Sequence, residues 1–420
     1  MKLNVIDLFA GCGGLTDGFM QTKKYESLAV VDWVFPALNT LKKRLSEKWG
    51  YNIDSDKYLH FDIQRIDELF NGYIDKQFGI NPGLNKLIGN NKVDVVVGGP
   101  PCQAYSIAGR VRDKAGMQND YRNYLFESYV SVVNEYKPQA FVFENVEGIL
   151  SAKPGGIPII DRITKAFDEI GYVITSDLRR NALFDTSYYN VPQKRKRVII
   201  FGVSKTNFSN PQETIRSFYN LMLDKKEEIP LNSKSAFDNL PGLYPVRGKK
   251  HSHEVKNEPK VKTKNHEPRK HSERDIEIFK TLAQDIKSKN FKYISTKSLI
   301  ELYKEKTGKD SNFHKYHVIR EDKPSNTIPA HLYKDGLRHI HPDPEQARTI
   351  TVREAARIQS FDDDYEFLGS KTDQYKMIGN AVPPKFAKLI AECVHQILSE
   401  TNYSYSPKIG LFEENQIEYA

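Results

Sequence analysis

Residues 93–103 read VDVVVGGPPCQ, a β-branched apolar run that stops abruptly at two glycines and two prolines. Such a run is typical of a strand buried on both faces of a parallel sheet. In open α/β sheets, ligands bind outside the carboxyl ends of the strands. The run therefore places Cys102, a potential sulfur nucleophile, where a ligand would bind. Taken alone, this cysteine is better explained as a small buried side chain in a turn, because free cysteines are among the most buried residues.

Similar apolar runs recur at residues 5–9, 28–31, 140–143 and 198–201, with helix-length segments between several of them. This alternation predicts an α/β fold with a doubly wound sheet inside residues 1–203. Apolar residues at helical spacing predict helices at residues 161–170, from Val352 to Ile358, and at 385–399, and residues 172–178 have the pattern of a further strand.

The composition limits the classes of protein that fit. The chain has 420 residues, a formal net charge of +8 and three cysteines. Three scattered cysteines are too few for a disulfide framework or a zinc site with paired ligands, so we expect no metal and a reducing, cytoplasmic location. No apolar run approaches the roughly 18 residues of a membrane span. The positive charge suits a polyanionic partner.

The middle of the chain has a different texture. From Lys205 to Lys323 no strand-helix alternation persists, and residues 247–274 are dense in Lys, Arg and His. A disordered linker is one explanation, but the position between two well-patterned regions favours a second, smaller domain. The last twenty residues, rich in Tyr, Ser and Asn, are expected to form a mobile tail.

A glycine-rich turn follows the first predicted strand. The sequence DLFAGCGGL at residues 7–15 lets a ligand approach the backbone closely before a helix begins. The pattern of three spaced glycines typical of dinucleotide sites is not met, because Thr16 occupies the third place, which lowers a dehydrogenase interpretation. We therefore expect a nucleotide-like cofactor of another kind.

The next strands supply side chains for an adenosine. Asp32 ends the second strand and suits ribose hydroxyls, and Trp33 suits an adenine face. Asp62 and Ile63 offer polar and apolar contacts to the base. Separately, Asp32 fits a helix cap and Trp33 fits the core; together after a glycine turn they favour an adenosine site.

Two further polar groups follow strands. Glu144 lies after the apolar residues 141–143, where an apolar environment favours the protonated form of a carboxyl. The sequence QKRKR at residues 193–197 precedes another strand, and its arginines suit a carbonyl or a phosphate. Each has a plain alternative, because Glu144 also fits a helix cap and the arginines a solvated strand entry.

Together these residues closely resemble the DNA cytosine carbon-5 methyltransferase family, of the bacterial restriction-modification type, in the linear order of that family. The resemblance rests on DLFAGCGG at 7–14, GPPCQ at 99–103, ENV at 144–146, QKRKR at 193–197, REAARIQ at 353–359 and GNAVPP at 379–384. It implies a methyltransferase-type mixed sheet with a smaller DNA-recognition domain, S-adenosylmethionine as cofactor and double-stranded DNA as partner.

The resemblance also implies roles for individual residues. Cys102 would be the nucleophile, Glu144 would contact a flipped cytosine, and Arg195 and Arg197 would hold the base and order the catalytic loop. The cofactor site would comprise Phe9, Gly11, Gly13, Gly14, Asp32, Trp33, Asp62, Ile63, Pro100 and Asn380. Two departures concern this site: Asp32 stands where the family usually has Glu, and Phe61 precedes Asp62 where glycine is common.

The chemistry of the residues suits this reaction. Carbon 5 of cytosine is a poor nucleophile, but thiolate addition at carbon 6 makes an enamine whose carbon 5 can attack a sulfonium methyl group. Cys102 would begin the reaction, and Glu144 would protonate or hydrogen-bond ring nitrogen 3. An ordinary thiol has a pKa of about 8.5, so neighbouring positive charge should help to activate Cys102.

The family pattern divides the chain. Residues 1–203 and 346–400 would form the catalytic domain, residues 204–345 a target recognition domain, and residues 401–420 a tail. Thr327 would lie near the catalytic loop, where the recognition domain closes. Residues 103–122 would close over the extruded base, with Ser106, Arg110 and Arg122 available to phosphate.

Three rival functions remain open. Methyltransferases acting on an exocyclic amine usually have an aromatic residue where Cys102 stands. A transfer RNA cytosine carbon-5 methyltransferase would share the cysteine chemistry, although the long basic region favours DNA. A DNA-binding module with a vestigial enzyme fold is disfavoured by the complete set of Cys102, Glu144, Arg195 and Arg197. We expect a monomer, with a cognate endonuclease acting on the same site.

Overall fold

The computed structural model describes residues 2–101, 125–246, 252–255, 263–310, 315–334 and 336–400. Within these ranges, eight strands form one mixed sheet in the order β3-β2-β1-β6-β7-β10-β8, with β9 paired to β10. The strands are β1 Leu3–Leu8, β2 Tyr25–Asp32, β3 Tyr58–His60, β6 Val95–Gly98, β7 Ala140–Val146, β8 Tyr172–Ile174, β9 Leu183–Asp185 and β10 Lys196–Ser204. The predicted α/β fold of the methyltransferase type is confirmed.

The order of the parallel strands creates a crevice at one edge of the sheet. β3, β2, β1, β6 and β7 are mutually parallel, whereas β10 is antiparallel to β7, β8 and β9. The chain runs outward from β1 to β3 and resumes beside β1 with β6. Ligands in doubly wound sheets bind where the strand order reverses in this way. The loops after β1 and β6 flank that point.

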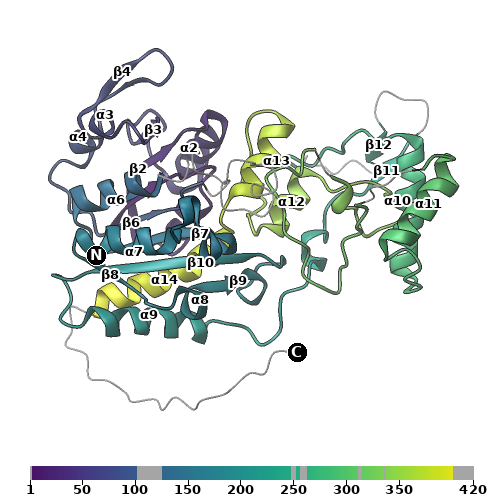
Figure 1. Cartoon of the computed structure of the whole chain (residues 1–420). Helices are drawn as coiled ribbons and strands as arrows, with labels where there is room; N and C mark the ends of the chain where they lie inside the picture. Colours follow the sequence, from purple (N-terminus) through teal and green to yellow (C-terminus); the bar gives the residue numbers. More distant parts are fainter. Residues whose placement is uncertain are drawn as a thin grey trace.

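Helices cover both faces of the sheet. On one side of β7 and β10 lie α6 Leu125–Tyr136 and α7 Ile159–Glu169, and on the other lie α14 Pro384–Glu400 and α9 Pro211–Asp224 (Figure 1). α14 also packs against α1 Gly14–Gln21. The buried Tyr129 hydroxyl donates to the carbonyls of Val96 and Val142, at 2.9 and 3.0 Å, and so ties α6 to the strands that carry the site.

Four shorter or peripheral helices and one hairpin complete this part of the chain. The helices are α2 Phe35–Trp49, α3 Ile66–Asn71, α4 Leu84–Ile88 and α8 Leu178–Asn181. The hairpin consists of β4 Tyr73–Asp75 and β5 Gly79–Asn81, which pair only with each other and project from the body of the molecule (Figure 1).

A smaller part of the molecule stands beside the sheet. It carries β11 Leu243–Pro245, β12 His253–Val255, α10 Glu273–Lys287 and α11 Thr296–Thr307 (Figure 1). Its apolar cluster includes Phe279, Leu302 and Ile340. Between the two parts lie α12 Val352–Ile358 and α13 Lys371–Asn380, which share a second cluster with Cys12 and Ala37.

α12 begins at a complete capping box. The Thr351 hydroxyl accepts a hydrogen bond from the Glu354 amide, and the Glu354 carboxylate accepts one from the Thr351 amide at 2.8 Å. The same carboxylate is held by the buried guanidinium of Arg348 at 2.6 Å. Burial alone would raise the pKa of Glu354, but the charge of Arg348 holds that pKa well below its usual value.

The structure corrects several expectations. The strand predicted at residues 172–178 ends at Ile174, because the Asp177 side chain accepts from the Arg180 amide and starts α8. The region from Lys205 to Lys323, where no alternation was visible, contains α9, α10 and α11, and α9 packs on the sheet. Helices occur, as predicted, around residues 161–170, 352–358 and 385–399. The predicted tail, residues 401–420, lies outside the described residues.

Buried histidines in the smaller part make stability sensitive to acid. Burial lowers the pKa of His271 and His341 to about 3 and that of His339 to about 4. The unfolded chain binds protons at these rings near pH 6.5, whereas the folded protein does not. We therefore expect the free energy of unfolding to fall as the pH decreases from about 6.5 toward about 3.

A His341→Asn substitution tests this expectation. Asparagine keeps an acceptor for the Asp343 amide, which now donates to His341 Nδ1 at 3.1 Å, but it binds no proton. The acid limb of the stability curve should become shallower by up to about 1.4 kcal/mol per pH unit, as measured by urea unfolding. His331→Asn, at an exposed position, is the matched control. Identical pH slopes in the two variants would contradict the assignment.

Candidate active site

The glycine turn after β1 is open on the side of the crevice. Phe9 and Gly11 both have positive φ angles, of 59° and 56°. A Cβ atom built on Gly11 would meet nothing within 4 Å, whereas one on Gly13 would strike Leu41 and one on Gly14 the Val382 carbonyl. Gly11 therefore leaves room for a ligand at the backbone, and the other two glycines permit close packing of the turn and α1.

Asp32 links the ends of β1 and β2. Its carboxylate accepts hydrogen bonds from the Gly11 amide at 2.7 Å and the Val34 amide at 2.6 Å. Burial raises its pKa to about 6 despite these bonds, which act in the opposite direction. Beside it the Trp33 side chain is 50% exposed, as suits a ring that covers a ligand.

The other predicted cofactor residues surround the same edge. Asp62 is partly buried and accepts from the Gln64 amide at 3.1 Å, and Ile63 is buried. Asn380 is exposed at the end of α13, next to the segment on which Gly14 packs. Pro100 follows β6, the strand adjacent to β1. The structure thus places Asp32, Asp62 and Pro100 at or just after the carboxyl ends of neighbouring strands, and Asn380 at the end of α13.

Asp7 was missed as a site residue, although its motif was recognised. Its side chain is 1% exposed, and one oxygen accepts from the Thr16 hydroxyl at 2.5 Å. The other oxygen is buried without a hydrogen-bond partner among the described residues. Burial raises its pKa to about 7. In the sequence, the sign of such a residue was an aspartate inside an apolar strand. In the structure, the carboxylate oxygen of Asp7 that lacks a partner lies near Asp32 and fits a polar ligand in the crevice.

Glu144 and Arg197 form the centre of the second half of the site. Glu144 comes from β7 and Arg197 from β10, which pair side by side in the sheet. The Arg197 Nε atom lies 2.7 Å from Glu144 Oε1, and both side chains are only 11% exposed. A Cβ atom on Gly99 would lie 2.6 Å from Glu144 Oε2, so any larger residue there would displace this carboxylate. The Asn145 amide donates to the Pro100 carbonyl at 3.2 Å and fixes the start of the Pro-Pro turn.

Arg195 has different surroundings from Arg197. It is 1% exposed, and its guanidinium donates to the carbonyls of Ile328, Gly379 and Ala381 at 2.9 to 3.1 Å. Burial, followed by the charge of Arg197, holds its pKa well below the usual value for arginine. Arg195 therefore anchors backbone, and Arg197 is the arginine that reaches Glu144.

Thr327 lies where the smaller part returns to the sheet. Its hydroxyl donates to the Lys194 carbonyl at 2.7 Å, and the Lys194 amide donates to the Ser325 carbonyl at 2.8 Å. Two buried glutamines, Gln193 and Gln359, hydrogen-bond each other at the same junction. Sequence reasoning quoted both glutamines within motifs and gave them no role.

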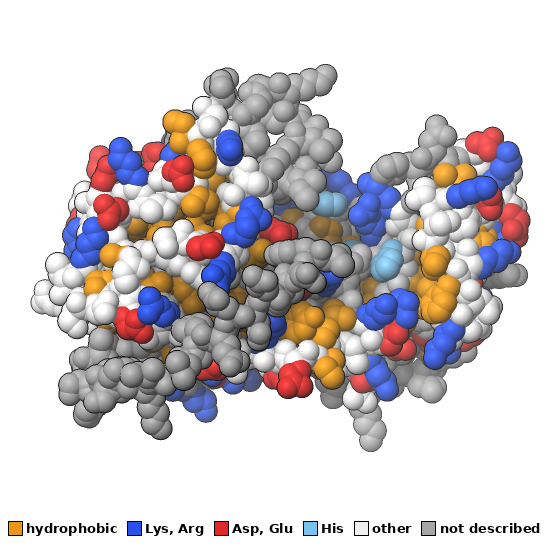
Figure 2. Space-filling model, turned by 60° about the horizontal axis from the view of Figure 1, so that its bottom comes forward, with side chains coloured by type: hydrophobic (Ala, Val, Ile, Leu, Met, Phe, Trp, Pro, Cys, Tyr) orange, Lys and Arg blue, Asp and Glu red, His pale blue; other side chains and the backbone are white. Residues whose placement is uncertain are grey.

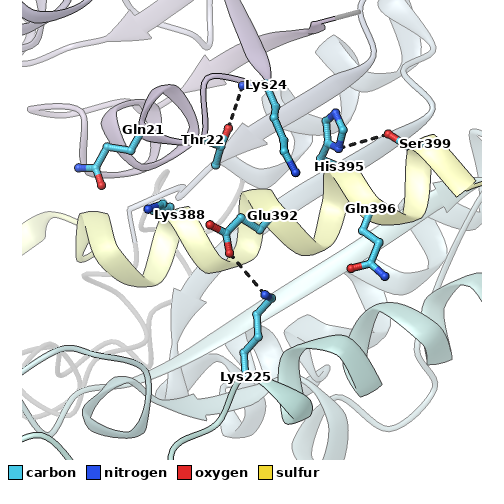
Figure 3. A pocket seen from close by; sticks show the side chains of 9 residues that line it. All are labelled: Gln21, Thr22, Lys24, Lys225, Lys388, Glu392, His395, Gln396 and Ser399. Carbon is cyan, nitrogen blue, oxygen red and sulfur yellow. Dashed lines mark hydrogen bonds and ion pairs between the residues drawn. The ribbon is translucent and has the colours of Figure 1, made fainter.

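Cys102, Ser106, Arg110 and Arg122 lie outside the described residues. Figure 2 shows a hollow between the larger and smaller parts of the molecule, with Lys and Arg side chains along its margins. A separate cavity of about 570 Å³ between α14, Lys24 and Lys225 lies at the opposite edge of the sheet, beside the start of β2 (Figure 3). That cavity is remote from the predicted site residues.

Comparison with known proteins identifies the family. A sequence model for C-5 cytosine-specific DNA methylases matches residues 3–396. The chain belongs to this family. Methyltransferase M.Bpa9945I of Bacillus paralicheniformis, a type II enzyme, is 35% identical over 94% of this chain and 99% of its own length. Type II methyltransferase M.DdeI of Desulfomicrobium norvegicum is 29% identical over 95% of this chain and 90% of its own.

Solved structures agree in fold. A protein of E. coli described as a candidate prophage-encoded DNA modification methyltransferase has a TM-score of 0.58 at 23% identity, over 95% of this chain and 100% of that one. The S. pombe Dnmt2 methyltransferase has a TM-score of 0.52 at 14% identity, over 96% of this chain and 100% of that one. The protein is a C-5 cytosine DNA methyltransferase of the restriction-modification type, and enzymes of this family use S-adenosylmethionine as methyl donor.

The described residues lack two further features. No helix there is both long enough and apolar enough to cross a membrane. The same ranges contain no group of three or more His, Cys, Asp or Glu side chains able to hold a metal ion.

Gly99→Ala tests the geometry around Glu144. The added methyl group would lie 2.6 Å from Glu144 Oε2, so the carboxylate must move. We expect methyl transfer to fall at least about tenfold, because misplacement by about 1 Å can cost 100-fold. Cofactor affinity, measured by calorimetry, should stay near that of the parent. Unchanged methylation by a folded Gly99→Ala protein would show that the position of Glu144 is not critical.

Proposed function

We propose that the protein methylates carbon 5 of a cytosine extruded from a specific duplex sequence, through a covalent adduct with Cys102. The proposal rests chiefly on the arrangement at the ends of β6 and β7. There the Pro100 carbonyl is held by Asn145, beside the ion pair of Glu144 and Arg197. Pro101, the last described residue of this turn, directly precedes Cys102 in the chain.

The reaction would proceed in three steps. The Cys102 thiolate adds to carbon 6, and the ring electrons move to carbon 5 while Glu144 protonates or hydrogen-bonds nitrogen 3. Carbon 5 would then attack the methyl group, which S-adenosylmethionine supplies as an electrophile when bound, and the methyl–sulfur bond would break with its electron pair left on the departing sulfur. Finally a base removes the carbon-5 proton, and elimination expels the thiolate to regenerate the enzyme.

The chain's charged residues would divide the work. Arg197 orients the Glu144 carboxylate and brings positive charge to the site, which favours a thiolate over a thiol. Arg195 would act as a positioning residue, because both terminal nitrogens of its guanidinium donate to backbone carbonyls. Asp32 would accept ribose hydroxyls on its remaining lone pairs, and Trp33 would cover the adenine.

We assign DNA reading to a target recognition domain at residues 204–345, apart from α9, which packs on the sheet. Its helices α10 and α11 lie on the far side of the hollow in Figure 2, which suits a duplex between the two parts. Extrusion of the base costs a few kcal/mol. The matching family, that of C-5 cytosine-specific DNA methylases, favours DNA over transfer RNA as substrate. A monomer in the cytoplasm with a cognate endonuclease remains our prediction.

A trapped adduct tests the covalent step. Duplex DNA carrying 5-fluorocytosine in its recognition site should form a stable complex with the parent protein and cofactor, because fluorine cannot leave as a proton does. Mass spectrometry should show the increase in mass, and Cys102→Ala should abolish both the adduct and turnover while cofactor binding persists. Bisulfite sequencing of DNA from expressing cells would supply the recognition site. Turnover by purified Cys102→Ala would exclude the mechanism.

Salt dependence tests the DNA surface. Each neutralised phosphate contributes about −0.9 to the slope of log affinity against log salt, so we expect a steep decrease in binding with salt. Lys194 is exposed beside Thr327, and Lys194→Gln should make this slope shallower by about one. Lys165→Gln, on the exposed face of α7, is the matched control. A flat response in the parent would refute the phosphate contacts.

A further inference from the structure

The hairpin β4–β5 carries a side chain toward the predicted adenosine site. Phe78 lies in its turn, and the rings of Phe78 and Trp33 meet edge to face, with centroids 5.8 Å apart and an interplanar angle of 75°. Trp33 is half exposed, and the hairpin is separate in sequence from β2, whose end places Trp33. The Phe78 ring therefore limits the rotation of the Trp33 indole.

Phe78 is itself held firmly. The Asp75 carboxylate accepts from the amides of Gln77 and Phe78, at 2.7 and 3.1 Å, and closes the turn. Arg65 donates to the other Asp75 oxygen at 2.8 Å, and its guanidinium lies over the rings of Phe61 and Phe78. A phenyl ring fixed in this way can orient a partner ring without losing much conformational freedom itself.

The rest of the contacts connect Phe78 to β3. Its ring packs edge to face on Phe61 at 5.3 Å and on His60 at 5.1 Å. His60 Nε2 lies 2.9 Å from the Trp33 carbonyl, and Phe61 precedes Asp62. Aromatic rings from the hairpin and from β3 therefore fill the space beside Asp62.

We propose that Phe78 is a positioning residue of the S-adenosylmethionine site, which holds the Trp33 indole in the orientation that covers the adenine. The inference rests on the proposed function, because it takes Trp33 as the adenine contact. An edge-to-face pair contributes about 0.5–1.5 kcal/mol, which corresponds to about a two- to tenfold change in affinity. The ring acts on cofactor binding and not on the cysteine chemistry.

Tryptophan fluorescence makes the proposal testable without turnover. The chain has two tryptophans, Trp33 and Trp49, so a Trp49→Phe parent reports on Trp33 alone. Phe78→Ala in that parent should shift Trp33 emission to the red and weaken S-adenosylmethionine binding about two- to tenfold. The KM for cofactor should rise by the same factor, with kcat and the KM for DNA unchanged.

Three further variants separate positioning from folding. Ile74→Ala changes an 86% exposed residue of the same hairpin and should leave cofactor affinity unaltered. Phe78→Tyr should restore affinity, whereas Phe78→Leu keeps apolar volume without a ring and should not. Equal affinity in Phe78→Ala and Ile74→Ala, or full rescue by leucine, would overturn the proposal. Failure of the parent itself to bind S-adenosylmethionine would instead refute the proposed function, and the inference with it.

Discussion

The buried guanidinium of Arg195 joins the two stretches of chain that make the site. Arg195 immediately precedes β10. It donates to the carbonyls of Gly379 and Ala381, on either side of Asn380, and to that of Ile328 in the segment that returns from the smaller part. Removing a charge from water costs several kcal/mol, which charge-assisted hydrogen bonds of about 1.5–3 kcal/mol each can offset. The three acceptor carbonyls come together only when the returning segment and the end of α13 are both in place. The buried charge of Arg195 therefore favours this arrangement of the chain over others.

The same junction couples the recognition region to the chemistry. Ile328, one of the Arg195 acceptors, donates its amide to Gln193, and Thr327 binds the carbonyl of Lys194. Arg197, two residues beyond Arg195, contacts Glu144. A displacement of the returning segment would therefore move the strand entry that sets the ion pair. The region proposed to read DNA and the residue proposed to contact cytosine thus share one short piece of backbone.

The sequence predicted the parts of the fold whose physics is local. Buried apolar runs located β1, β2, β6, β7 and β10, and the glycines and prolines that follow β6 marked the end of that strand. The helices α9 to α11 were not predicted, although the buried apolar residues of α9 and α10 recur at helical spacing. What this spacing does not show is that α9 packs on the sheet and α10 on a separate small cluster. Periodicity alone does not reveal which surface covers a helix.

The site was predicted in outline and not in its pairings. Composition and order grouped Arg195 with Arg197, but their surroundings differ. Arg195 is buried among backbone carbonyls, whereas Arg197 lies beside the Glu144 carboxylate. Phe78 carries no motif, since its relation to Trp33 arises from a hairpin that packs across strands. Contacts of this kind depend on the tertiary fold and leave no periodic signal.

The glycines before the Pro-Pro turn connect the strand signal to the chemistry. A buried carboxylate without a partner is costly, so Glu144 needs the charge of Arg197, which occupies Oε1. The second oxygen, Oε2, then lies against Gly99, where a side chain would push the carboxylate aside. A larger residue there would fill the space in which this oxygen stays available to a base. Gly98 and Gly99 end the buried strand β6. Because Gly99 has no side chain, it also leaves Glu144 Oε2 free to form a hydrogen bond next to the Pro-Pro turn.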